Sequence, residues 1–303
     1  MADLSVNIAG VPFKNPVIPA SGTFGNGREY EQFYPLSKLG GISVKGMTLH
    51  GQPGNPAPRV AETPAGMLNS VGLQNPGVDH FIEHELPNLM TKDTVVIANV
   101  AGHTVEDCAE IARRLDSTPV HMLELNISCP NVKQGGAAFG TSCQNAAQVT
   151  AAVRQATNKP LMVKLSPNVT SIVEIAQAVE SAGADAVSLI NTLLGMRIDL
   201  KTRRPILKNN VGGLSGPAVF PVAVRMVWQV ANAVRIPVVG MGGISTWQDA
   251  VEMMLAGAAA VQVGAAIFAD PYAPVKIIDG LNQYLDENGI ARVSELTGAV
   301  RPW

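Results

Sequence analysis

The sequence predicts an α/β protein, a TIM (β/α)8 barrel with a small N-terminal hairpin and long insertions in the loops that follow two strands at the C-terminal face. Three observations lead to this class. Eight short apolar segments recur along the chain, and amphipathic stretches lie between most of them. Polar residues or glycines stand where these segments end. The length of 303 residues suits one such barrel, so we expect a single domain over residues 1–303.

The predicted strands are runs rich in valine, isoleucine and leucine that are too short for helices and are bounded by turn residues. They cover residues 15–20, 41–44, 94–100, 122–127, 161–165, 186–190, 237–241 and 260–263. Before them, residues 4–14 hold two shorter alternating pieces on either side of Ala9-Gly10. This pattern predicts a hairpin that closes the bottom of the barrel.

Three stretches between the strands carry apolar residues at helical spacing, and a glycine closes the second and the third. Their apolar stripes are Val105, Cys108, Ala109, Ala112 and Leu115; Ile172, Ile175, Ala176 and Val179; and Trp247, Val251, Met254 and Leu255. Two further connections, residues 47–77 and 193–215, are too long for simple turns. Both leave the carboxyl ends of strands, so we expect both to wall the mouth of an active site.

Composition limits the partners and the compartment. A net charge of −2 leaves no basic surplus for nucleic acid or for an anionic membrane. The first residues lack the basic and apolar regions of a signal peptide, and we expect the cytoplasm. The cysteines Cys108, Cys129 and Cys143 form no C-x-x-C pair, which argues against a disulfide framework or an iron–sulfur site on this chain.

No metal site is expected. Residues 80–84 match the H-x-x-E-H pattern of zinc peptidases. They lie on a predicted outer helix, away from the strand ends, and a five-residue match arises readily by chance. We therefore interpret them as a solvated helix face.

The ends of the predicted strands carry polar side chains and glycines. The interior of a barrel is normally filled by branched apolar residues, so lysine and asparagine there call for a polar ligand. These strand-end residues are Ser21, Lys45, Asn99, Asn126, Lys164, Asn191, Gly242, Gly243, Gly264 and Ala265. Bare glycine backbone after the last two strands is the usual phosphate site of such barrels. A phosphorylated cofactor is implied, and FMN fits better than a pyridoxal group, because Lys45 and Lys164 could offset the charge of a reduced isoalloxazine.

The segment from Leu123 to Gly140 contains the leading candidate for chemistry. Its first half alternates like a strand, Pro130 ends the strand, and Gly135 and Gly136 predict a mobile loop with hinges. Cys129 stands at this transition, between amide and hydroxyl side chains. A free thiol titrates near ~8.5, so it can act as a base without a neighbouring histidine.

Simpler interpretations exist for the same residues. Cys129 could be an inert buried thiol, as most free cysteines are. Cys108 lies in a helical stripe and is expected in the core, and Cys143 is expected to pack near a helix start. A lysine at a strand end could also form a Schiff base, which would make the protein a barrel lyase.

Seven motifs, spread over nearly the whole chain, resemble those of class 1 dihydroorotate dehydrogenases. The matching stretches are N-P-V-I-P-A-S-G (15–22), V-K-G (44–46), N-x-x-G-L (69–73), N-I-S-C-P-N (126–131), V-K-L-S-P (163–167), I-N-T (190–192) and G-M-G-G-I (240–244). The cysteine in N-I-S-C-P-N separates class 1 from the membrane-bound class, which uses serine. The glycine-rich stretch at residues 132–140 resembles subclass 1B, the NAD-linked form.

The resemblance implies a role for each matched residue. Cys129 would take the C5 proton of dihydroorotate while a hydride passes from C6 to N5 of FMN, in pyrimidine (UMP) biosynthesis. Substrate would be held by Lys45, Asn69, Ser70, Val71, Gly72, Leu73, Asn126, Asn131, Asn191 and Thr192. One FMN per chain would be held by Ser21, Lys45, Gly46, Asn99, Asn126, Lys164, Ile190, Gly216, Gly242, Gly243, Gly264 and Ala265.

The resemblance also implies partners. Subclass 1B enzymes pair two catalytic chains with two subunits that carry FAD and a 2Fe-2S cluster, which pass electrons to NAD. The alternatives are a fumarate-linked class 1A homodimer, a dihydropyrimidine dehydrogenase-like reductase, the Schiff-base lyase, and a flavin-binding protein without catalysis.

Overall fold

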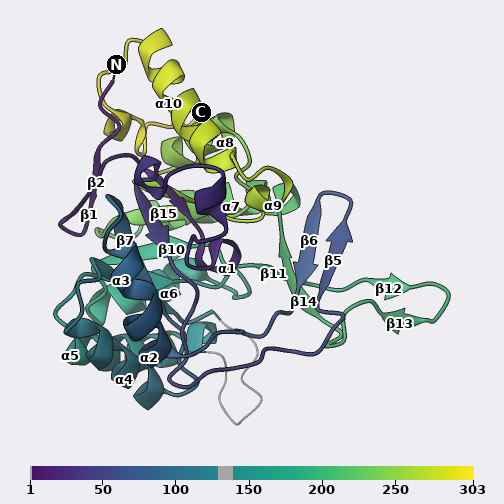
Figure 1. Ribbon diagram of the computed structural model, residues 1–303. Helices are drawn as coiled ribbons and strands as arrows, with labels where there is room; N and C mark the ends of the chain where they lie inside the picture. The colour runs from purple at the N-terminus through teal and green to yellow at the C-terminus, as the bar shows by residue number, and fades with distance from the viewer. Residues whose placement is uncertain (1, 129–138) are drawn as a thin grey trace.

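The structure, a computed structural model, describes residues 2–128 and 139–303 (Figure 1). Its centre is an eight-stranded sheet with the strand order β3-β16-β15-β10-β9-β8-β7-β4. The strands are β3 (Val17–Pro19), β4 (Gly41–Ser43), β7 (Val95–Val100), β8 (Met122–Asn126), β9 (Leu161–Lys164), β10 (Ala186–Leu189), β15 (Val238–Met241) and β16 (Ala260–Val263). All pair in parallel, and the Gly40 N–H donates to Val17 O at 3.2 Å, which joins the two edges. The predicted barrel is confirmed.

The strands form where the sequence predicted them because both of their faces are buried. Helices cover the outside and side chains fill the inside, so each strand reads as a nearly continuous apolar run. All six residues of β7 are buried, for example. The predicted ends differ from the observed ones by one or two residues, at positions where the chain leaves the sheet.

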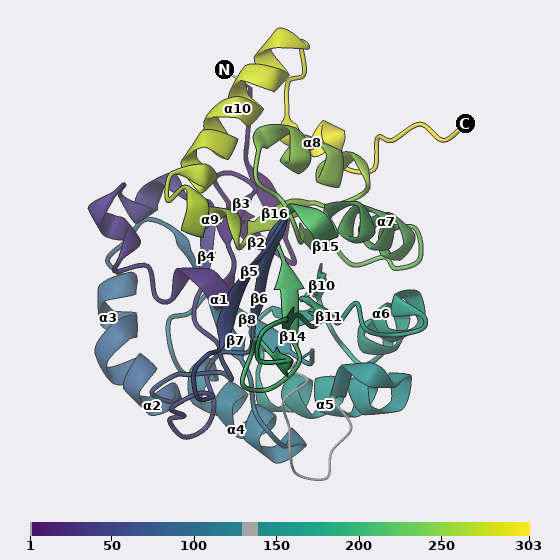
Figure 2. The ribbon, with the colours of Figure 1, turned by 90° about the vertical axis from the view of Figure 1, so that its right-hand side faces the viewer.

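A ring of helices surrounds the sheet (Figure 2). Its longer members are α4 (Val105–Asp116), α5 (Cys143–Ala156), α6 (Ile172–Ser181), α7 (Phe220–Ala231), α8 (Trp247–Leu255) and α10 (Ala273–Glu287). Hydroxyl side chains cap several of them, as at Thr104, whose Oγ1 accepts from Asp107 N at 3.0 Å. The predicted stripes face inward, with Cys108, Ala112 and Leu115 all buried in α4.

Short elements fill the remaining connections. The hairpin β1 (Val6–Ile8) and β2 (Val11–Phe13) is antiparallel, as predicted, and in Figure 1 it lies across the barrel from β5 and β6. Between β4 and β7 the chain forms α2 (Val78–His80), the π-helix η3 (Phe81–Glu85) and α3 (Leu86–Leu89). The other short helices are α1 (Ser21–Phe24), α9 (Ala266–Ala269), η1 (Tyr30–Gln32), η2 (Leu36–Lys38), η4 (Phe139–Thr141), η5 (Pro217–Val219) and η6 (Val293–Leu296).

The two long connections pair with each other, which the sequence did not predict. They contribute β5 (Val60–Thr63), β6 (Gly66–Asn69), β11 (Leu193–Gly195) and β14 (Gly212–Ser215) to an antiparallel sheet ordered β11-β14-β6-β5, here called the added sheet. A hairpin of β12 (Ile198–Asp199) and β13 (Arg204–Pro205) extends beyond it. The strands approach closely at Gly66, where a Cβ would lie 2.0 Å from Ser215 O.

Candidate active site

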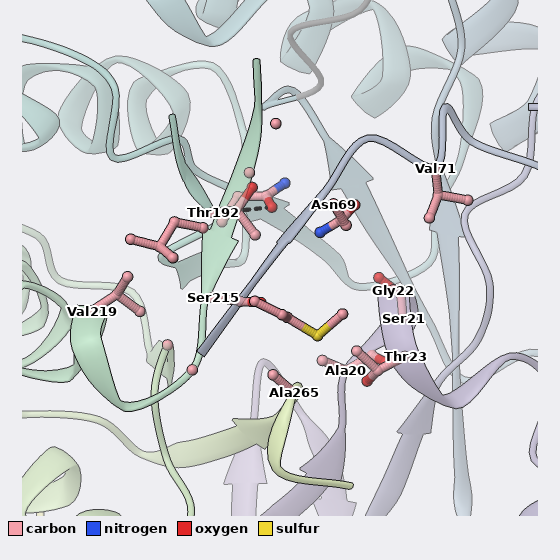
Figure 3. Close-up of a pocket in the computed structure, with 18 of the residues that line it drawn as sticks. Ala20, Ser21, Gly22, Thr23, Asn69, Val71, Thr192, Ser215, Val219 and Ala265 are labelled. Carbon is pink, nitrogen blue, oxygen red and sulfur yellow. Dashed lines mark hydrogen bonds between the residues drawn. The ribbon is translucent and has the colours of Figure 1, made fainter. Parts of the chain in front are cut away.

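The carboxyl ends of the barrel strands surround one cavity of about 820 Å³, a volume typical of small-molecule sites (Figure 3). Every barrel strand, or the residues just after it, contributes to the lining. In strand order along the chain these residues are Ser21, Lys45, Asn99, Asn126, Lys164, Ile190, Gly242 and Gly264. The convergence follows from the fold, because parallel strands in a barrel end on the same face.

The added sheet closes the other side of the cavity. Met67 and Asn69 of β6, Leu194 of β11 and Ser215 of β14 line it, and in Figure 3 Asn69 and Ser215 lie between Ser21 and Val219. The stretch from Ser70 to Leu73 lines it as well. Both long connections therefore wall the mouth of the cavity, as the sequence predicted.

A cluster of amides and hydroxyls lies where β8 and β10 end. Asn126 Oδ1 accepts from Ser128 Oγ at 2.6 Å and from Ser128 N at 3.2 Å. The Asn191 amide nitrogen donates to Ser128 Oγ and, at 3.5 Å, to Asn126 Oδ1. Thr192 N donates to Asn191 Oδ1 at 2.7 Å. These bonds hold the amides in fixed orientations, so a ligand with matching polar edges meets a site that is already ordered.

Glycines line the end of the cavity beyond β15. Gly216, Gly242 and Gly243 have φ of +100°, +118° and +79°, in the left-handed region that favours glycine. A Cβ on Gly216 would lie 2.5 Å from Gly66 Cα, and one on Gly243 would lie 2.8 Å from Phe220 N. The backbone there stays bare, which suits close approach of an anionic group.

A buried carboxylate that was not predicted from the sequence lies inside the barrel. Glu124 of β8 is 0% exposed. It accepts hydrogen bonds from Ser43 Oγ (2.8 Å), Asn99 Nδ2 (2.6 Å), Ser188 Oγ (2.9 Å) and Gln262 Nε2 (2.7 Å). Burial alone raises the pKa of a carboxyl group, but the positive charge of Lys164 and these hydrogen bonds outweigh it. The pKa of Glu124 therefore lies below its ordinary value, and the group is ionised.

The signal that could have found Glu124 was present in the sequence. Buried strands are apolar throughout, so a single polar residue at the centre of an apolar run needs a partner inside the barrel. Such residues are the serines of I-S-V (42–44) and V-S-L (187–189), the glutamate of L-E-L (123–125) and the glutamine of V-Q-V (261–263). Glu124 alternates with Leu123 and Leu125, a pattern typical of strands with one face in water, whereas the residues of β8 from Met122 to Leu125 are all buried.

The structure brings together every predicted site residue that it describes. All of them line the cavity: Ser21, Lys45, Gly46, Asn69, Ser70, Val71, Gly72, Leu73, Asn99, Asn126, Lys164, Ile190, Asn191, Thr192, Gly216, Gly242, Gly243, Gly264 and Ala265. Cys129, Asn131 and the glycines at 135 and 136 lie outside the described residues. The predicted roles of all these residues remain predictions.

The other two cysteines lie where packing was predicted. Cys108 is fully buried in α4, and Cys143 is half-buried at the start of α5 against the core. Burial raises the pKa of the Cys108 thiol to about 12. We therefore expect Cys108 to remain unlabelled by iodoacetamide in the native protein at about pH 8 and to react once urea unfolds the chain, as peptide mass mapping will show. Equal labelling in both states would mean that the thiol is accessible.

The H-x-x-E-H segment forms the predicted solvated helix face. His80, Glu83 and His84 are exposed, and the two histidine rings stack with centroids 4.5 Å apart. Across residues 2–128 and 139–303, no group of three or more His, Cys, Asp or Glu side chains is arranged to hold a metal ion. Within the same ranges no helix combines the length and apolar composition that crossing a bilayer requires.

The eight-stranded parallel barrel, with a polar cavity at its carboxyl end, places the protein among the TIM-barrel enzymes. The family model described as dihydroorotate dehydrogenase matches residues 3–285. The chain belongs to the dihydroorotate dehydrogenase family.

Curated relatives support this membership over nearly the full length. A protein of Bacteroides thetaiotaomicron is 58% identical over 99% of both chains, and one of Geotalea uraniireducens is 59% identical over 98% of both. Each is named dihydroorotate dehydrogenase B (NAD(+)), catalytic subunit. A crystal structure of DHODH from Eimeria tenella, in complex with ferulenol, matches with a TM-score of 0.83 over 98% of this chain and 88% of that chain. At 24% identity it supports the fold alone.

Proposed function

We propose that this chain oxidises dihydroorotate to orotate in pyrimidine biosynthesis and passes the electrons, through a second subunit, to NAD. The names of the relatives indicate the reaction and the acceptor. For this chain, the main support for the proposal is that all eight strands end in polar residues or glycines around one cavity. Such a cavity can bind a large phosphorylated cofactor and a small polar ring together.

The cofactor proposed is FMN, one per chain, and the family membership supports a flavin. The cavity fits it in three respects: its volume, the bare glycine backbone beyond β15 and β16, and buried acceptor atoms at its inner end. Gly216, Gly242, Gly243, Gly264 and Ala265 would hold the phosphate side. Ser21, Lys45, Gly46, Asn99, Asn126, Lys164 and Ile190 would hold the ring. The bound flavin would supply the acceptor for the hydride that leaves C6 of dihydroorotate.

The substrate would bind between the amide cluster and the added sheet. Asn126, Asn191 and Thr192 offer fixed donors and acceptors for the ring amides, and Lys45 offers a positive charge for the carboxylate. Asn69 to Leu73 would cover the substrate from β6, and Asn131 would complete the set.

Cys129 is proposed as the base that takes the C5 proton. It follows Ser128 directly in the chain, and Ser128 is anchored by both Asn126 and Asn191. A thiol is a suitable base because its pKa is far closer to neutral than that of a hydroxyl group. The proposal gives a role to a cysteine that, in the sequence, comes directly after the amide and hydroxyl residues at the end of β8.

The relatives are named catalytic subunits, which supports a separate partner subunit for this chain. We propose two catalytic chains with two partner subunits that carry FAD and a 2Fe-2S cluster, working in the cytoplasm. Exposed apolar side chains on the added sheet and its hairpin would suit a subunit contact. They include Leu194, Met196, Ile198 and Leu200, the last 88% exposed. The mass of the complex, purified with and without the companion subunit, tests the stoichiometry.

The reaction is tested by adding dihydroorotate anaerobically to the FMN-loaded chain and recording the visible flavin absorbance. We expect bleaching by dihydroorotate, and return of the absorbance on adding NAD only when the companion subunit is present. Reoxidation of the isolated chain by fumarate would indicate the class 1A reaction instead. Bleaching by dihydrouracil but not by dihydroorotate would indicate a dihydropyrimidine reductase, and no bleaching by either would contradict the proposal.

A further inference from the structure

A polar layer crosses the interior of the barrel beneath the cavity. It consists of Ser43, Glu124, Ser188 and Gln262, which come from the alternate strands β4, β8, β10 and β16. Alternate strands of a TIM barrel normally supply one such layer of four interior side chains, and branched apolar residues normally fill it. Here the layer is held together by hydrogen bonds to one carboxylate.

The layer lies directly below the proposed ligand-binding residues. Two positions further along the chain are Asn126, the last residue of β8, and Lys45, Ile190 and Gly264, which follow the ends of β4, β10 and β16. All four of those residues line the cavity. Asn99 and Lys164, from the strands on either side of β8, line it as well.

The carboxylate of Glu124 determines the orientation of the side-chain amides of Asn99 and Gln262. An ionised carboxylate can only accept hydrogen bonds, so Asn99 and Gln262 must turn their NH2 groups towards it. Each carboxylate oxygen accepts one amide and one hydroxyl: Oε2 from Asn99 and Ser43, and Oε1 from Gln262 and Ser188. The amide carbonyl oxygens consequently face away from Glu124.

Those two carbonyl oxygens are buried and lack a partner among the described residues. Asn99 Oδ1 and Gln262 Oε1 make no hydrogen bond within residues 2–128 and 139–303, although both side chains are 0% exposed. Both residues line the cavity. A Cβ on Gly46 would lie 2.8 Å from Asn99 Oδ1, so this oxygen lies against the backbone beside Lys45. A buried acceptor without a partner is unfavourable, and a ligand N–H would relieve it.

We propose that Glu124 is a positioning residue for the cofactor: it fixes Asn99 and Gln262 as acceptors for a ring N–H of the flavin, and its charge compensates Lys164. The inference rests on the proposed flavin function, and it identifies the residues that determine which edge of the flavin ring faces the inside of the barrel. The isoalloxazine carries one N–H on its pyrimidine edge, between two carbonyl groups. Acceptors fixed at the inner end of the cavity orient that edge inward.

The variant Glu124→Gln separates this role from simple filling of the barrel. Glutamine has the same shape but places an NH2 group where one carboxylate oxygen was. The neighbouring serine hydroxyl can rotate to accept from it, but the neighbouring amide must flip. A flip of Asn99 or Gln262 would present an NH2 group to the ring N–H, and the negative charge beside Lys164 would be lost.

The experiment titrates FMN and riboflavin into the apo-protein and follows quenching of flavin fluorescence. We expect Glu124→Gln to raise the dissociation constant about tenfold or more for both flavins, because the altered contact is to the ring they share. The matched control is Ser43→Ala, which removes one hydrogen bond to Glu124 but keeps the charge and both amides. It is expected to bind within about twofold of wild type.

A second readout is the midpoint potential of the bound flavin. Loss of the Glu124 charge leaves Lys164 uncompensated, so the potential of Glu124→Gln is expected to be more positive than that of wild type, while Ser43→Ala leaves it unchanged. A folded Glu124→Gln protein with wild-type affinity and potential would overturn the inference. Equal weakening by Ser43→Ala and Glu124→Gln, without a change in potential, would overturn it also.

If Glu124→Gln fails to fold, the variant Gln262→Met tests the inference instead. It removes one of the two acceptors proposed for the ring N–H and keeps the negative charge of Glu124. The inference then predicts severalfold weaker flavin binding at an unchanged potential, and unchanged binding contradicts it. Failure of the wild-type apo-protein to bind FMN would overturn the proposed function itself, and this inference with it.

Discussion

Cys129→Ala is expected to lower the rate of flavin reduction by dihydroorotate by about 10²- to 10⁴-fold, the usual contribution of a general base, while FMN stays bound. The C5 proton would then have no group to receive it. Flavin binding is expected to persist because the proposed FMN contacts come from other residues. Stopped-flow absorbance under anaerobic conditions measures the rate, and the visible spectrum reports the bound cofactor.

Two cysteine variants control this result. Cys143→Ala removes a half-buried thiol at the start of α5 and is expected to reduce flavin at the wild-type rate. Cys129→Ser is expected to be slow and to gain rate as the pH rises, because a hydroxyl is a far weaker acid than a thiol. An undiminished rate in Cys129→Ala, or a wild-type pH profile in Cys129→Ser, would exclude the thiol as the base.

Lys164→Met is expected to lower the folding stability strongly. Lys164 is 6% exposed and interacts electrostatically with Glu124, which is 0% exposed. Removing the lysine leaves a buried carboxylate without its compensating charge, which costs on the order of 3 kcal/mol. We expect urea unfolding of the apo-protein to show that loss in the free energy of unfolding, and we expect FMN binding to weaken.

The double variant Glu124→Gln/Lys164→Met tests whether charge is the reason. It removes both members of the pair, so most of the stability lost in Lys164→Met should return. Lys201→Met, at an exposed position, is the matched control and should unfold like wild type within about 0.5 kcal/mol. A double variant no more stable than Lys164→Met would show that packing of the lysine chain, rather than its charge, accounts for the loss.

The barrel strands were predictable because their signal is local. A strand buried on both faces reads as an uninterrupted apolar run, and eight such runs leave few alternatives to a closed parallel barrel. The site followed from the fold. Since every strand must end on the same face, Lys45, Asn126 and Lys164 could be placed together before any contact was known.

The added sheet and the buried carboxylate were not predicted, for different physical reasons. β6 and β14 pair across more than a hundred residues of sequence, and their short glycine-containing segments show no alternation to suggest a strand. The burial of Glu124 was not predicted because a polar residue in a strand usually indicates a solvent-exposed face. Its four hydrogen-bond donors lie on four other strands of the barrel. Only the closed geometry reveals that those donors meet.

We expect the cavity to hold FMN with its ring at the buried amides and its phosphate at the glycines. A crystal structure of the chain with FMN and orotate tests this placement. We expect the phosphate beside Gly243 and Gly264, a ring N–H within hydrogen-bond distance of Asn99 Oδ1 or Gln262 Oε1, and orotate between the ring and Asn191. Flavin density with the ring at the glycines, or density outside the barrel mouth, would rule out this placement of FMN.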